Sequence, residues 1–373
     1  MSQTRVKKIL LTGGHAATVA ISVVEKLLET SGKDHPQIYW IGAKKAMEGK
    51  TIATIESDVL PKLGVSTHLI SAGKLQRKFN RWTIPALAKI PLGFVQAAKL
   101  LGKIKPDIIL SFGGFAAFPV VFVGWLKGIP VILHEQTMTA GRANKLSVPF
   151  VKKIAVARPR SIKHFPSQKV VVTGNPIMSQ IAGISPKTIM GEPGTIYITG
   201  GSRGASSLNS LIKPLLPKLL KKYVVIQQTG PLDFEEFTKI QRSLKGEDRK
   251  RYEVYSQINP MQIGEVYKRA DILIGRSGAS TVSEIMALHI PSIFIPLPFT
   301  YDNEQTKNAE YAKAEGLAEV LPQAKATPQA LLGLIEKTFK NWELMVSKAA
   351  KFESPDKKAS SNLVDLVLGE LRS

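Results

Sequence analysis

Residues 271–308 combine hydroxyl, amide and carboxylate side chains with two short apolar runs, a pattern suited to holding a polar ligand. The first run, residues 271–274, ends at a glycine and is followed by a polar turn and by helical spacing over residues 282–288. The second run, residues 291–295, opens into a loop and a further helix. In parallel α/β proteins ligands bind where strand ends meet helix starts, and a helix N-terminus favours an anion.

Glu284 lies in the first two turns of the helix expected after the polar turn. A carboxylate in this place can accept hydrogen bonds from two hydroxyl groups, such as those of a ribose. The alternative is a carboxylate that only complements the helix dipole. The residues alone leave both interpretations open.

A second candidate site lies near the N-terminus, where apolar residues 6–11 lead into the tetrapeptide TGGH at residues 12–15. Helical periodicity follows over residues 16–30. Strand, glycine turn and helix can form a phosphate cradle, although two glycines are a weak signal. His15 stands at the carboxyl end of the expected strand, which makes it a candidate for catalysis. The alternative is a structural histidine.

Two more expected strands of this half end in residues that bind ligands. Residues 107–112 lead into Gly-Gly-Phe at 113–115, and residues 130–133 lead into His-Glu-Gln at 134–136. Three such strand ends in one half favour a shared cleft. The remaining strands expected here are residues 37–41, 67–70 and 170–173.

The strand–turn–helix alternation restarts in the second half of the chain. Residues 183–194 have little periodicity and are interpreted as an inter-domain linker. A strand at residues 195–199, a glycine turn at 200–205 and a strand at 223–228 then repeat the earlier order. A chain of 373 residues also favours two domains over one. The predicted fold class is α/β.

The composition narrows the classes of function. With 44% hydrophobic and 21% charged residues, the chain has ordinary globular values. The absence of cysteine excludes disulfides and thiolate metal sites. No signal peptide and no apolar run of about 18 residues is found, so a membrane-spanning helix is not expected. The formal charge of +22 favours a polyanionic partner, either nucleic acid or an anionic membrane.

Residues 74–105 contain basic and apolar residues and no acidic one. Pro85 and Pro91 are expected to break the segment into short helical pieces or a loop and a helix. This composition is typical of a surface segment that enters anionic lipid headgroups. The alternative is a core-facing amphipathic helix with a solvated basic face. Nucleic acid is not predicted, because the stacking aromatics in the segment are few; they are Phe79, Trp82 and Phe94.

Eight motifs, taken in chain order, resemble the MurG family, the GT-B glycosyltransferases that make lipid II at the cytoplasmic face of the membrane. In the first half they are TGGH at 12–15, FGGF at 112–115, HEQ…G..NK at 134–145 and GNP at 174–176. In the second half they are GGS.GA..LN at 200–209, QTG at 228–230, RSGA.TVSE at 276–284 and Q..NA at 305–309. They cover nearly the whole chain.

The resemblance implies a GT-B fold of two Rossmann-like domains with parallel sheets facing an inter-domain cleft. Residues 1–178, with a C-terminal helix at about 354–373, would form the acceptor and membrane domain, and residues 179–353 the donor domain. It also implies an inverting transferase that moves N-acetylglucosamine from UDP-N-acetylglucosamine to undecaprenyl-linked lipid I. The enzyme would lie peripherally on an anionic membrane surface. No cofactor and no metal are expected, and the chain has no Asp-x-Asp motif.

Carried onto this chain, the family's pattern assigns a set of residues to UDP-N-acetylglucosamine, with Ser202 on the diphosphate, Glu284 on the ribose, and Gln305 and Asn308 on the sugar. The set is Thr12, Gly13, Gly14, Ser202, Ala279, Ser280, Thr281, Val282, Ser283, Glu284, Gln305 and Asn308. For the catalytic base we predict His15, whose imidazole titrates near neutral pH, with Glu135 as the second candidate.

Five positions depart from the family's pattern. Leu10 and Leu11 replace glycines, and Thr18 replaces a proline. Thr137 replaces an asparagine, and Met178 replaces an arginine whose guanidinium it cannot imitate.

Two other classes of function stay open. One is another GT-B enzyme, either a glycolipid glycosyltransferase or a sugar-nucleotide epimerase. An epimerase should lack the basic and apolar segment. The other is a non-catalytic membrane-bound module that binds a UDP-sugar, which loss of the donor residues would favour. Glu284, Gln305 and Asn308 are all present.

Overall fold

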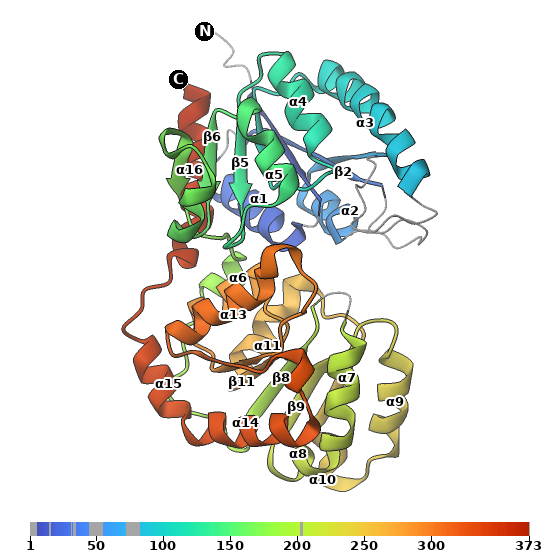
Figure 1. Cartoon of the computed structure of the whole chain (residues 1–373), viewed down its shortest axis with the longest axis vertical. Coiled ribbons are helices and arrows are strands. Elements are labelled where there is room, and N and C mark those ends of the chain that lie inside the picture. Colours follow the sequence, from blue (N-terminus) through green and yellow to red (C-terminus); the bar gives the residue numbers. More distant parts are fainter. Residues whose placement is uncertain are drawn as a thin grey trace. The chain divides into compact units, whose positions relative to one another are not determined.

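The structure is a computed structural model, and it describes residues 6–14, 16–30, 32, 35–44, 55–71, 83–201 and 204–372, with the backbone alone at residues 55 and 83–89. The chain forms two compact units (Figure 1). Unit 1 comprises residues 1–179 and 355–373, and unit 2 comprises residues 180–354.

Unit 1 is built on a seven-stranded sheet in the order β3-β2-β1-β4-β5-β6-β7, with every neighbouring pair parallel. Its strands are β1 (Lys8–Gly13), β2 (Gln37–Ala43), β3 (Ser66–Ile70), β4 (Ile108–Ser111), β5 (Val131–Glu135), β6 (Lys153–Val156) and β7 (Val170–Val172). The central strands are apolar on both sides because helices cover both faces of the sheet.

The helices of unit 1 form two layers. They are α1 (Ala17–Thr30), α2 (Ile55–Val59), α3 (Thr83–Ile104), α4 (Phe118–Leu126), α5 (Arg142–Ser147) and α16 (Ala359–Arg372), with the short α6 (Ser179–Ala182) at the boundary between the units. Figure 1 shows α1 and α16 side by side on one face and α3 and α4 together on the other. Leu10 of β1 packs into the same apolar cluster as Leu101 of α3 and Val120 of α4.

Helix α3 runs without interruption from Thr83 to Ile104 and contains Pro91. The expectation of a break at Pro91 is therefore wrong, whereas Pro85 lies in the first turn of α3, where a proline is tolerated. Pro91 removes one backbone donor, but the buried side chains of α3 hold the helix against the sheet and against α4. Residues 72–82 of the predicted membrane segment, with Phe79 and Trp82, lie outside the described residues.

A buried ion pair fastens the C-terminal segment to unit 1. The Arg158 guanidinium donates to both carboxylate oxygens of Asp356, at 2.6 Å and 2.7 Å. The backbone N–H of Asn175 donates to Oδ1 of the same carboxylate at 2.7 Å. Asp356 stands directly before α16, so this contact determines where the last helix docks.

Unit 2 is built on a six-stranded sheet in the order β10-β9-β8-β11-β12-β13, again with parallel pairs. Its strands are β8 (Thr195–Thr199), β9 (Val224–Gln228), β10 (Tyr252–Tyr255), β11 (Ile272–Gly275), β12 (Ser292–Phe294) and β13 (Ala318–Val320). Its helices are α7 (Ser206–Ile212), α8 (Leu216–Lys222), α9 (Phe234–Ser243), α10 (Gly246–Lys250), α11 (Ile263–Arg269), α12 (Ala279–Leu288), α13 (Glu304–Ala314), α14 (Pro328–Lys340) and α15 (Trp342–Ala349). The predicted class of two α/β halves with parallel sheets is confirmed.

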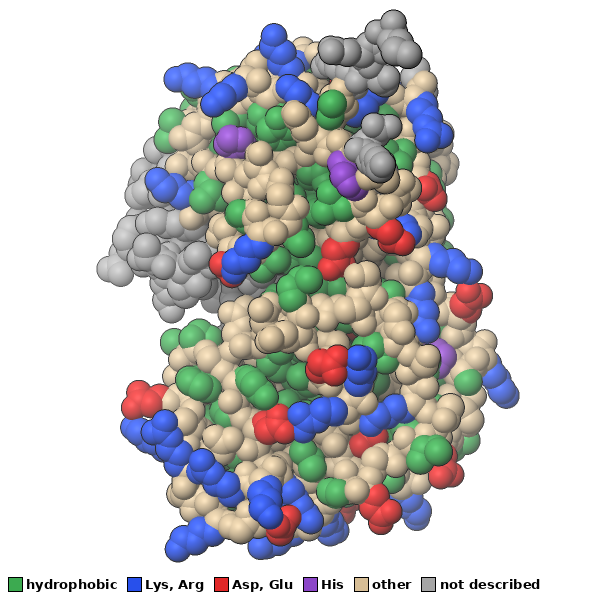
Figure 2. All heavy atoms as spheres, turned by 180° about the vertical axis from the view of Figure 1, so that it is seen from behind, with side chains coloured by type: hydrophobic (Ala, Val, Ile, Leu, Met, Phe, Trp, Pro, Cys, Tyr) green, Lys and Arg blue, Asp and Glu red, His purple; other side chains and the backbone are tan. Residues whose placement is uncertain are grey.

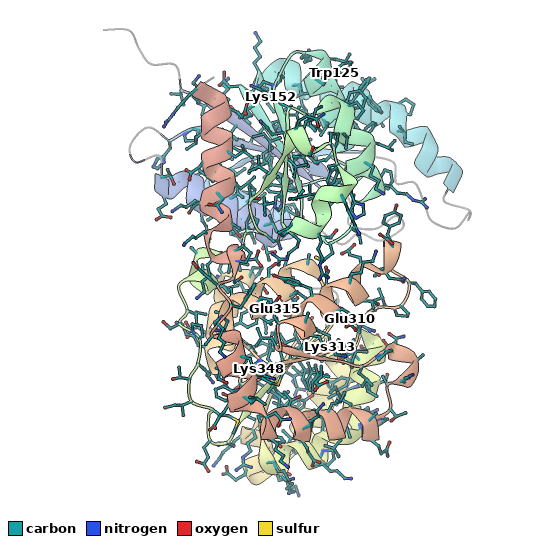
Figure 3. All side chains as sticks on the ribbon, turned by 60° about the vertical axis from the view of Figure 1, so that its left-hand side comes forward. Trp125, Lys152, Glu310, Lys313, Glu315 and Lys348 are labelled. Carbon is teal, nitrogen blue, oxygen red and sulfur yellow. The ribbon has the colours of Figure 1, made fainter. Side chains whose placement is uncertain are left out.

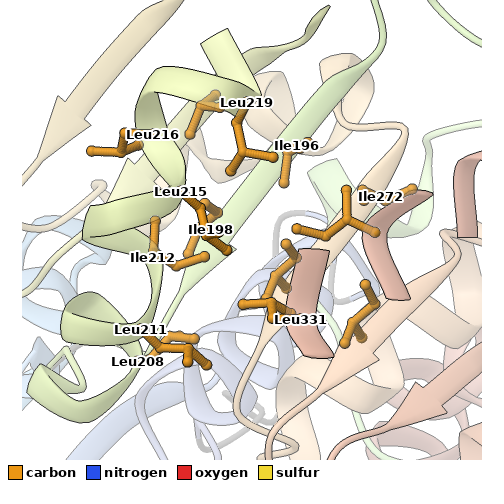
Figure 4. Close-up of a cluster of buried hydrophobic side chains, with 14 of the residues drawn as sticks. Ile196, Ile198, Leu208, Leu211, Ile212, Leu215, Leu216, Leu219, Ile272 and Leu331 are labelled. Atoms are coloured by element: carbon orange, nitrogen blue, oxygen red, sulfur yellow. The ribbon is translucent and has the colours of Figure 1, made fainter. Parts of the chain in front are cut away.

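The main core of unit 2 lies between its sheet and helices α7, α8 and α14 (Figure 4). Ile196 and Ile198 of β8 point into this cluster and contact leucines of α7 and α8. Side chains alternate along a strand, so the intervening Tyr197 points to the opposite face. That face carries α11, whose Tyr267 ring meets Tyr197.

The segment interpreted as a linker, residues 183–194, belongs to unit 2. The buried Asp271 carboxylate accepts a hydrogen bond from the Gly191 N–H at 3.1 Å and pairs with Lys187 Nζ at 2.8 Å. It also accepts the Thr195 N–H at 2.7 Å. The segment lacks periodicity because a side chain distant in sequence organises it.

Candidate functional site

The connections from the strands reverse direction once in each sheet, and ligands of open α/β sheets bind at that switch point. The switch point lies between β1 and β4 in unit 1, and between β8 and β11 in unit 2. The turns that follow these strands begin at Gly14, Phe112, Gly200 and Arg276. Four of the motifs found in the sequence therefore stand at the two switch points.

The two glycine turns of unit 1 contact each other. The Gly14 N–H donates to the Gly113 carbonyl oxygen at 3.0 Å. A Cβ added to Gly114 would lie 3.2 Å from the Gly14 Cα, and one added to Gly113 would lie 2.1 Å from Asn144 Oδ1. Gly113 and Gly114 also have φ values of +77° and +87°, which glycine adopts without strain. The close approach of the two turns requires these glycines.

Glu135 organises the loop after β5. Its Oε1 accepts the Thr137 N–H at 3.1 Å and the Thr137 hydroxyl at 2.9 Å. Its Oε2 accepts the Gly141 N–H at 3.1 Å and the Asn144 amide at 2.7 Å. Burial raises the pKa of the Glu135 carboxyl, and these hydrogen bonds oppose the rise. Both oxygens are thus engaged by the loop itself.

A carboxylate from α2 already occupies the N-terminal end of α1. The Ala16 N–H donates to Glu56 Oε1 at 3.0 Å, so a phosphate would meet a like charge at this helix end. The phosphate-cradle interpretation of the first glycine turn is therefore disfavoured. Thr12 is fully buried, and its hydroxyl donates to the Ile41 carbonyl oxygen at 2.7 Å. His15 lies outside the described residues.

His134, the first residue of the His-Glu-Gln strand end, is buried. Its Nε2 lies 3.1 Å from the Gly174 carbonyl oxygen. Burial lowers the pKa of His134 to about 4, so the ring is neutral near pH 7 and donates through Nε2. It ties the strand β5 to the GNP motif rather than facing a ligand.

The departures from the family's pattern lie in ordinary structural positions. Leu10 and Leu11 are buried residues of β1, paired with β2 and β4. Thr18 lies in the first turn of α1. The Met178 side chain is buried, and Thr137 belongs to the hydrogen-bonded loop after β5.

Hydrogen bonds to α13 hold the turn after β11 in unit 2. The Ser277 hydroxyl donates to the Gln305 carbonyl oxygen at 2.7 Å, and the Asn308 amide donates to the Ser277 carbonyl oxygen at 3.1 Å. The Gln305 side-chain oxygen accepts the Leu297 N–H at 2.9 Å. Asn308 is buried and Gln305 is partly exposed. These contacts position the turn that leads into α12.

The N-terminus of α12 is open to a ligand. Gly278, which has no side chain, occupies the N-cap position. Residues 279–281, the first of the helix, are partly exposed, whereas Val282 and Ser283 are buried. Partly exposed residues at the positive end of a ten-residue helix suit an anion.

Glu284 lies one turn further along α12 and is 7% exposed. The Tyr267 hydroxyl of α11 donates to Glu284 Oε2 at 2.6 Å. Burial raises the pKa of the Glu284 carboxyl to about 7, although the Tyr267 hydrogen bond favours the charged form. Near neutral pH this carboxyl is therefore poised between its two protonation states.

The glycine turn after β8 contacts the neighbouring elements at Gly201 and Gly204. The Gly201 N–H donates to Thr199 Oγ1 at 3.0 Å, and the Gln228 amide donates to the Gly201 carbonyl oxygen at 2.9 Å. A Cβ on Gly204 would lie 2.1 Å from the Thr229 carbonyl oxygen. Ser202, predicted to contact the diphosphate, lies outside the described residues.

Arg276 connects several segments at this switch point through hydrogen bonds. The motif alone did not reveal this role. Its guanidinium donates to the Ile295 carbonyl oxygen at 2.6 Å, at the end of β12. It also donates to the Ser207 hydroxyl of α7 and to the Gln323 side chain, each at 2.7 Å. One side chain thus joins the turns after three strands.

The structure brings residues 279–284, Gln305 and Asn308 to one edge of the sheet of unit 2, and it brings Thr12, Gly13, Gly14 and Glu135 to the edge of the sheet of unit 1 at which its strands end. Across the part of the chain that the structure describes, no cluster of three His, Asp or Glu side chains is placed to hold a metal ion. No described helix is long and apolar enough to cross a membrane.

Both halves of the chain match one family. Residues 12–156 match the glycosyltransferase family 28 N-terminal domain, and residues 195–363 match the glycosyltransferase family 28 C-terminal domain. A relative from Pediococcus pentosaceus is 30% identical over 369 residues, covering 95% of this chain and 96% of the relative. It is named UDP-N-acetylglucosamine--N-acetylmuramyl-(pentapeptide) pyrophosphoryl-undecaprenol N-acetylglucosamine transferase.

Solved structures agree with this fold. The crystal structure of Acinetobacter baumannii MurG is 27% identical, with a TM-score of 0.69 and coverage of 97% of this chain and 99% of that one. A UDP-GlcNAc 2-epimerase from Neisseria meningitidis, bound to UDP-GlcNAc, has a TM-score of 0.65 over 98% of this chain and 100% of that one. At 14% identity the epimerase shares the fold alone.

Proposed function

The chain belongs to glycosyltransferase family 28, and from this premise we propose that it transfers N-acetylglucosamine from UDP-N-acetylglucosamine to lipid I. The product is lipid II for peptidoglycan synthesis. Unit 2 is assigned the sugar nucleotide, and unit 1 the undecaprenyl-linked acceptor. The activity would serve cell wall biogenesis and, through it, cell shape and division.

The observation that supports this most is the set of groups at the unit 2 switch point. An open helix N-terminus suits a diphosphate, and a carboxyl one turn further along α12 suits ribose hydroxyls. Gln305, partly exposed on α13, offers the Nε2 of its amide to sugar hydroxyls, while the buried Asn308 amide holds the turn below. We assign Ser202 and residues 279–283 to the same ligand.

In the proposed reaction the 4-hydroxyl of N-acetylmuramic acid attacks the anomeric carbon of the donor with inversion. The bond from that carbon to the diphosphate breaks, and UDP leaves with the electron pair. Negative charge develops on the diphosphate, where backbone N–H donors and the α12 dipole stabilise it. The attacking hydroxyl loses its proton to a base.

We assign the base to His15 and a positioning role to Glu135. The Glu135 oxygens accept four hydrogen bonds from their own loop, which leaves them poorly suited to take a proton from an acceptor hydroxyl. Thr12, Gly13 and Gly14 are assigned to the approach of the acceptor side to the donor sugar. A histidine is chosen because an imidazole has an ordinary pKa of about 6.5, which suits a general base near neutral pH.

We further propose that unit 1 binds the cytoplasmic face of the membrane. Leu92 and Val95 of α3, Trp125 and Leu126 of α4, and Leu146 of α5 are exposed apolar side chains. Helices α3 and α4 and the residues after α5 contribute an aromatic cluster that contains Phe94, Phe118, Phe122 and Phe150. We call these five exposed residues the apolar surface of unit 1. Trp125, labelled in Figure 3, meets Phe122 and Phe150 of this cluster with tilted rings, at centroid distances of 6.0 Å and 5.0 Å.

Basic residues frame the apolar surface of unit 1. Lys99 and Lys103 of α3, Lys127 after α4, and Lys145 of α5 are exposed. Figure 2 shows Lys and Arg side chains, in blue, at the upper end of unit 1. Apolar insertion with surrounding cations is how peripheral proteins bind anionic headgroups. The predicted segment, residues 74–105, would extend this surface.

One assay tests the transferase and separates it from the alternatives. Radiolabelled UDP-N-acetylglucosamine is incubated with the protein and a lipid I analogue, and the lipid-linked label and the UDP released are both quantified. Equal amounts of labelled lipid and UDP are expected. Epimerised sugar without labelled lipid would replace the proposal with an epimerase, and tight donor binding without turnover would replace it with a binding module.

A further inference from the structure

Two buried tyrosines of unit 2 belong to no motif and have no place in the reaction described above. Tyr267 of α11 is 4% exposed, and Tyr197 of β8 is 2% exposed. Their ring centroids lie 5.8 Å apart with an interplanar angle of 88°. Edge-to-face packing of this kind fixes both rings, since each also has only two side-chain torsions.

The Tyr267 hydroxyl is aimed at Glu284. It donates to Oε2 at 2.6 Å, a short bond of the length seen when a hydroxyl donates to an ionised carboxylate. Within the described part of the chain, Tyr267 is the hydrogen-bond partner that this carboxyl has. The second oxygen, Oε1, is left available to a ligand.

The type of partner matters for ligand binding. An arginine or lysine would neutralise the carboxylate and could hold both of its oxygens. A tyrosine is a neutral donor, and burial raises the pKa of Tyr267 far above neutrality, so the hydroxyl keeps its proton. It therefore orients the carboxylate without removing its charge.

The second tyrosine extends these contacts to the glycine turn. Tyr197 and Thr199 alternate with Ile198 along β8 and so lie on the same face of the sheet, and Thr199 Oγ1 accepts the Gly201 N–H at 3.0 Å. Gln228 completes this side by donating to the Gly201 carbonyl oxygen. Buried contacts thus run from Glu284 through Tyr267 to Tyr197, which stands on the strand that leads into the turn after β8.

We propose that Tyr267 is a positioning residue of the donor site, which sets the rotamer of Glu284 so that Oε1 meets the ribose hydroxyls of the nucleotide. The inference rests on the proposed function only in that the ligand is a uridine nucleotide. It implies that recognition of the ribose hydroxyls depends on a side chain that never touches the ligand.

The test compares UDP with 2′,3′-dideoxy-UDP by calorimetric titration of the full chain without acceptor. The wild-type protein is expected to prefer UDP by roughly 10- to 100-fold, the range for hydrogen bonds to a charged group. In Tyr267→Phe this preference is expected to fall to a few-fold at most, with the affinity for the dideoxy nucleotide unchanged. In Glu284→Gln the preference is also lost, and the double variant shows no further loss.

Tyr252→Phe is the matched control. Tyr252 is another buried tyrosine of unit 2, and its hydroxyl donates to Gln227 Oε1 at 2.7 Å, away from α12. It should lose stability as Tyr267→Phe does and should keep the wild-type preference for UDP. A folded Tyr267→Phe protein with the wild-type preference would overturn the proposal.

If Tyr267→Phe does not fold, proton NMR of the wild-type protein tests the proposal instead. The hydroxyl proton in so short a bond should resonate far downfield, should move upfield in Glu284→Gln, and should shift when UDP binds but not when the dideoxy nucleotide binds. No difference between the two nucleotides would also overturn the proposal. Failure of sugar transfer alone leaves the binding test intact, whereas a wild-type protein that binds no UDP overturns both proposals.

Discussion

Replacing Glu284 by glutamine should have two opposite effects that can be measured separately. The amide has the same size, and its oxygen can still accept the Tyr267 hydroxyl that lies 2.6 Å from Glu284 Oε2. The variant cannot ionise, however. It should therefore lose affinity for the donor and, at alkaline pH, gain stability as a free protein.

The gain in stability follows from the pKa of Glu284. Burial raises that pKa from 4.5 to about 7, so the folded protein binds more protons than the unfolded chain between these values. The contribution of Glu284 to stability is fully present below pH 4.5 and is lost as the pH rises through 7. The rise corresponds to about 3 kcal/mol, since one pKa unit is about 1.4 kcal/mol. Glu284→Gln removes this loss.

The loss in affinity follows from the ligand. A carboxylate can accept both ribose hydroxyls with charge-assisted hydrogen bonds, and a neutral amide oxygen cannot do so equally well. We expect UDP-N-acetylglucosamine to bind Glu284→Gln more weakly by about 1.5–3 kcal/mol.

Two measurements test this reasoning. Urea unfolding without ligand at pH 5 and pH 8 should show a gap between variant and wild type that widens with pH. Calorimetric titration with UDP-N-acetylglucosamine at pH 8 should show the weaker binding. Glu265→Gln is the control, because Glu265 is an exposed residue of α11 paired with Lys268 and should change neither. Equal pH dependence of stability in Glu284→Gln and wild type would refute the burial argument, and unchanged donor affinity would refute the ribose assignment.

His15→Ala should lower turnover by about 10²–10⁴-fold with little change in UDP affinity, measured on one folded preparation; near wild-type turnover would remove His15 as the base. Leu126→Glu should weaken co-sedimentation with anionic vesicles, because Leu126 is 62% exposed beside Trp125 on the apolar surface of unit 1. Wild-type binding should need anionic lipid and fade with salt, and equal binding to neutral vesicles would contradict this. Asp356→Ala should lower the free energy of unfolding by about 3–5 kcal/mol, since it removes the carboxylate that pairs with the buried Arg158 guanidinium. A loss below about 1 kcal/mol in urea unfolding would mean that the pair is not what docks α16.

Much of the fold could be predicted because its signals are local. Central strands of a parallel sheet are apolar runs that often end in glycine turns, and β1, β4, β8 and β11 all have this form. The short strands β6 (Lys153–Val156), β10 (Tyr252–Tyr255) and β13 (Ala318–Val320) were not predicted. Three or four residues of mixed polarity carry no measurable period, and only pairing with a neighbouring strand makes them strands.

Two further predictions failed because they used local sequence alone. They concern the segment at residues 183–194 and the prolines of α3. Local rules favoured a linker and a broken helix. Distant contacts overrode them, through Asp271 in the first case and through packing against α4 in the second.

The sequence by itself determined the order of strands, glycine turns and helices, and with it the switch points at which ligand-binding residues collect. Tertiary structure alone decided which of those residues keep an oxygen or N–H for a ligand. Glu135 uses both oxygens within its own loop, whereas Glu284 uses one on Tyr267. The physical reason is that backbone preference and the hydrophobic pattern depend on residues close in sequence. A hydrogen bond between two side chains depends on the distance between elements that come together only in the packed fold.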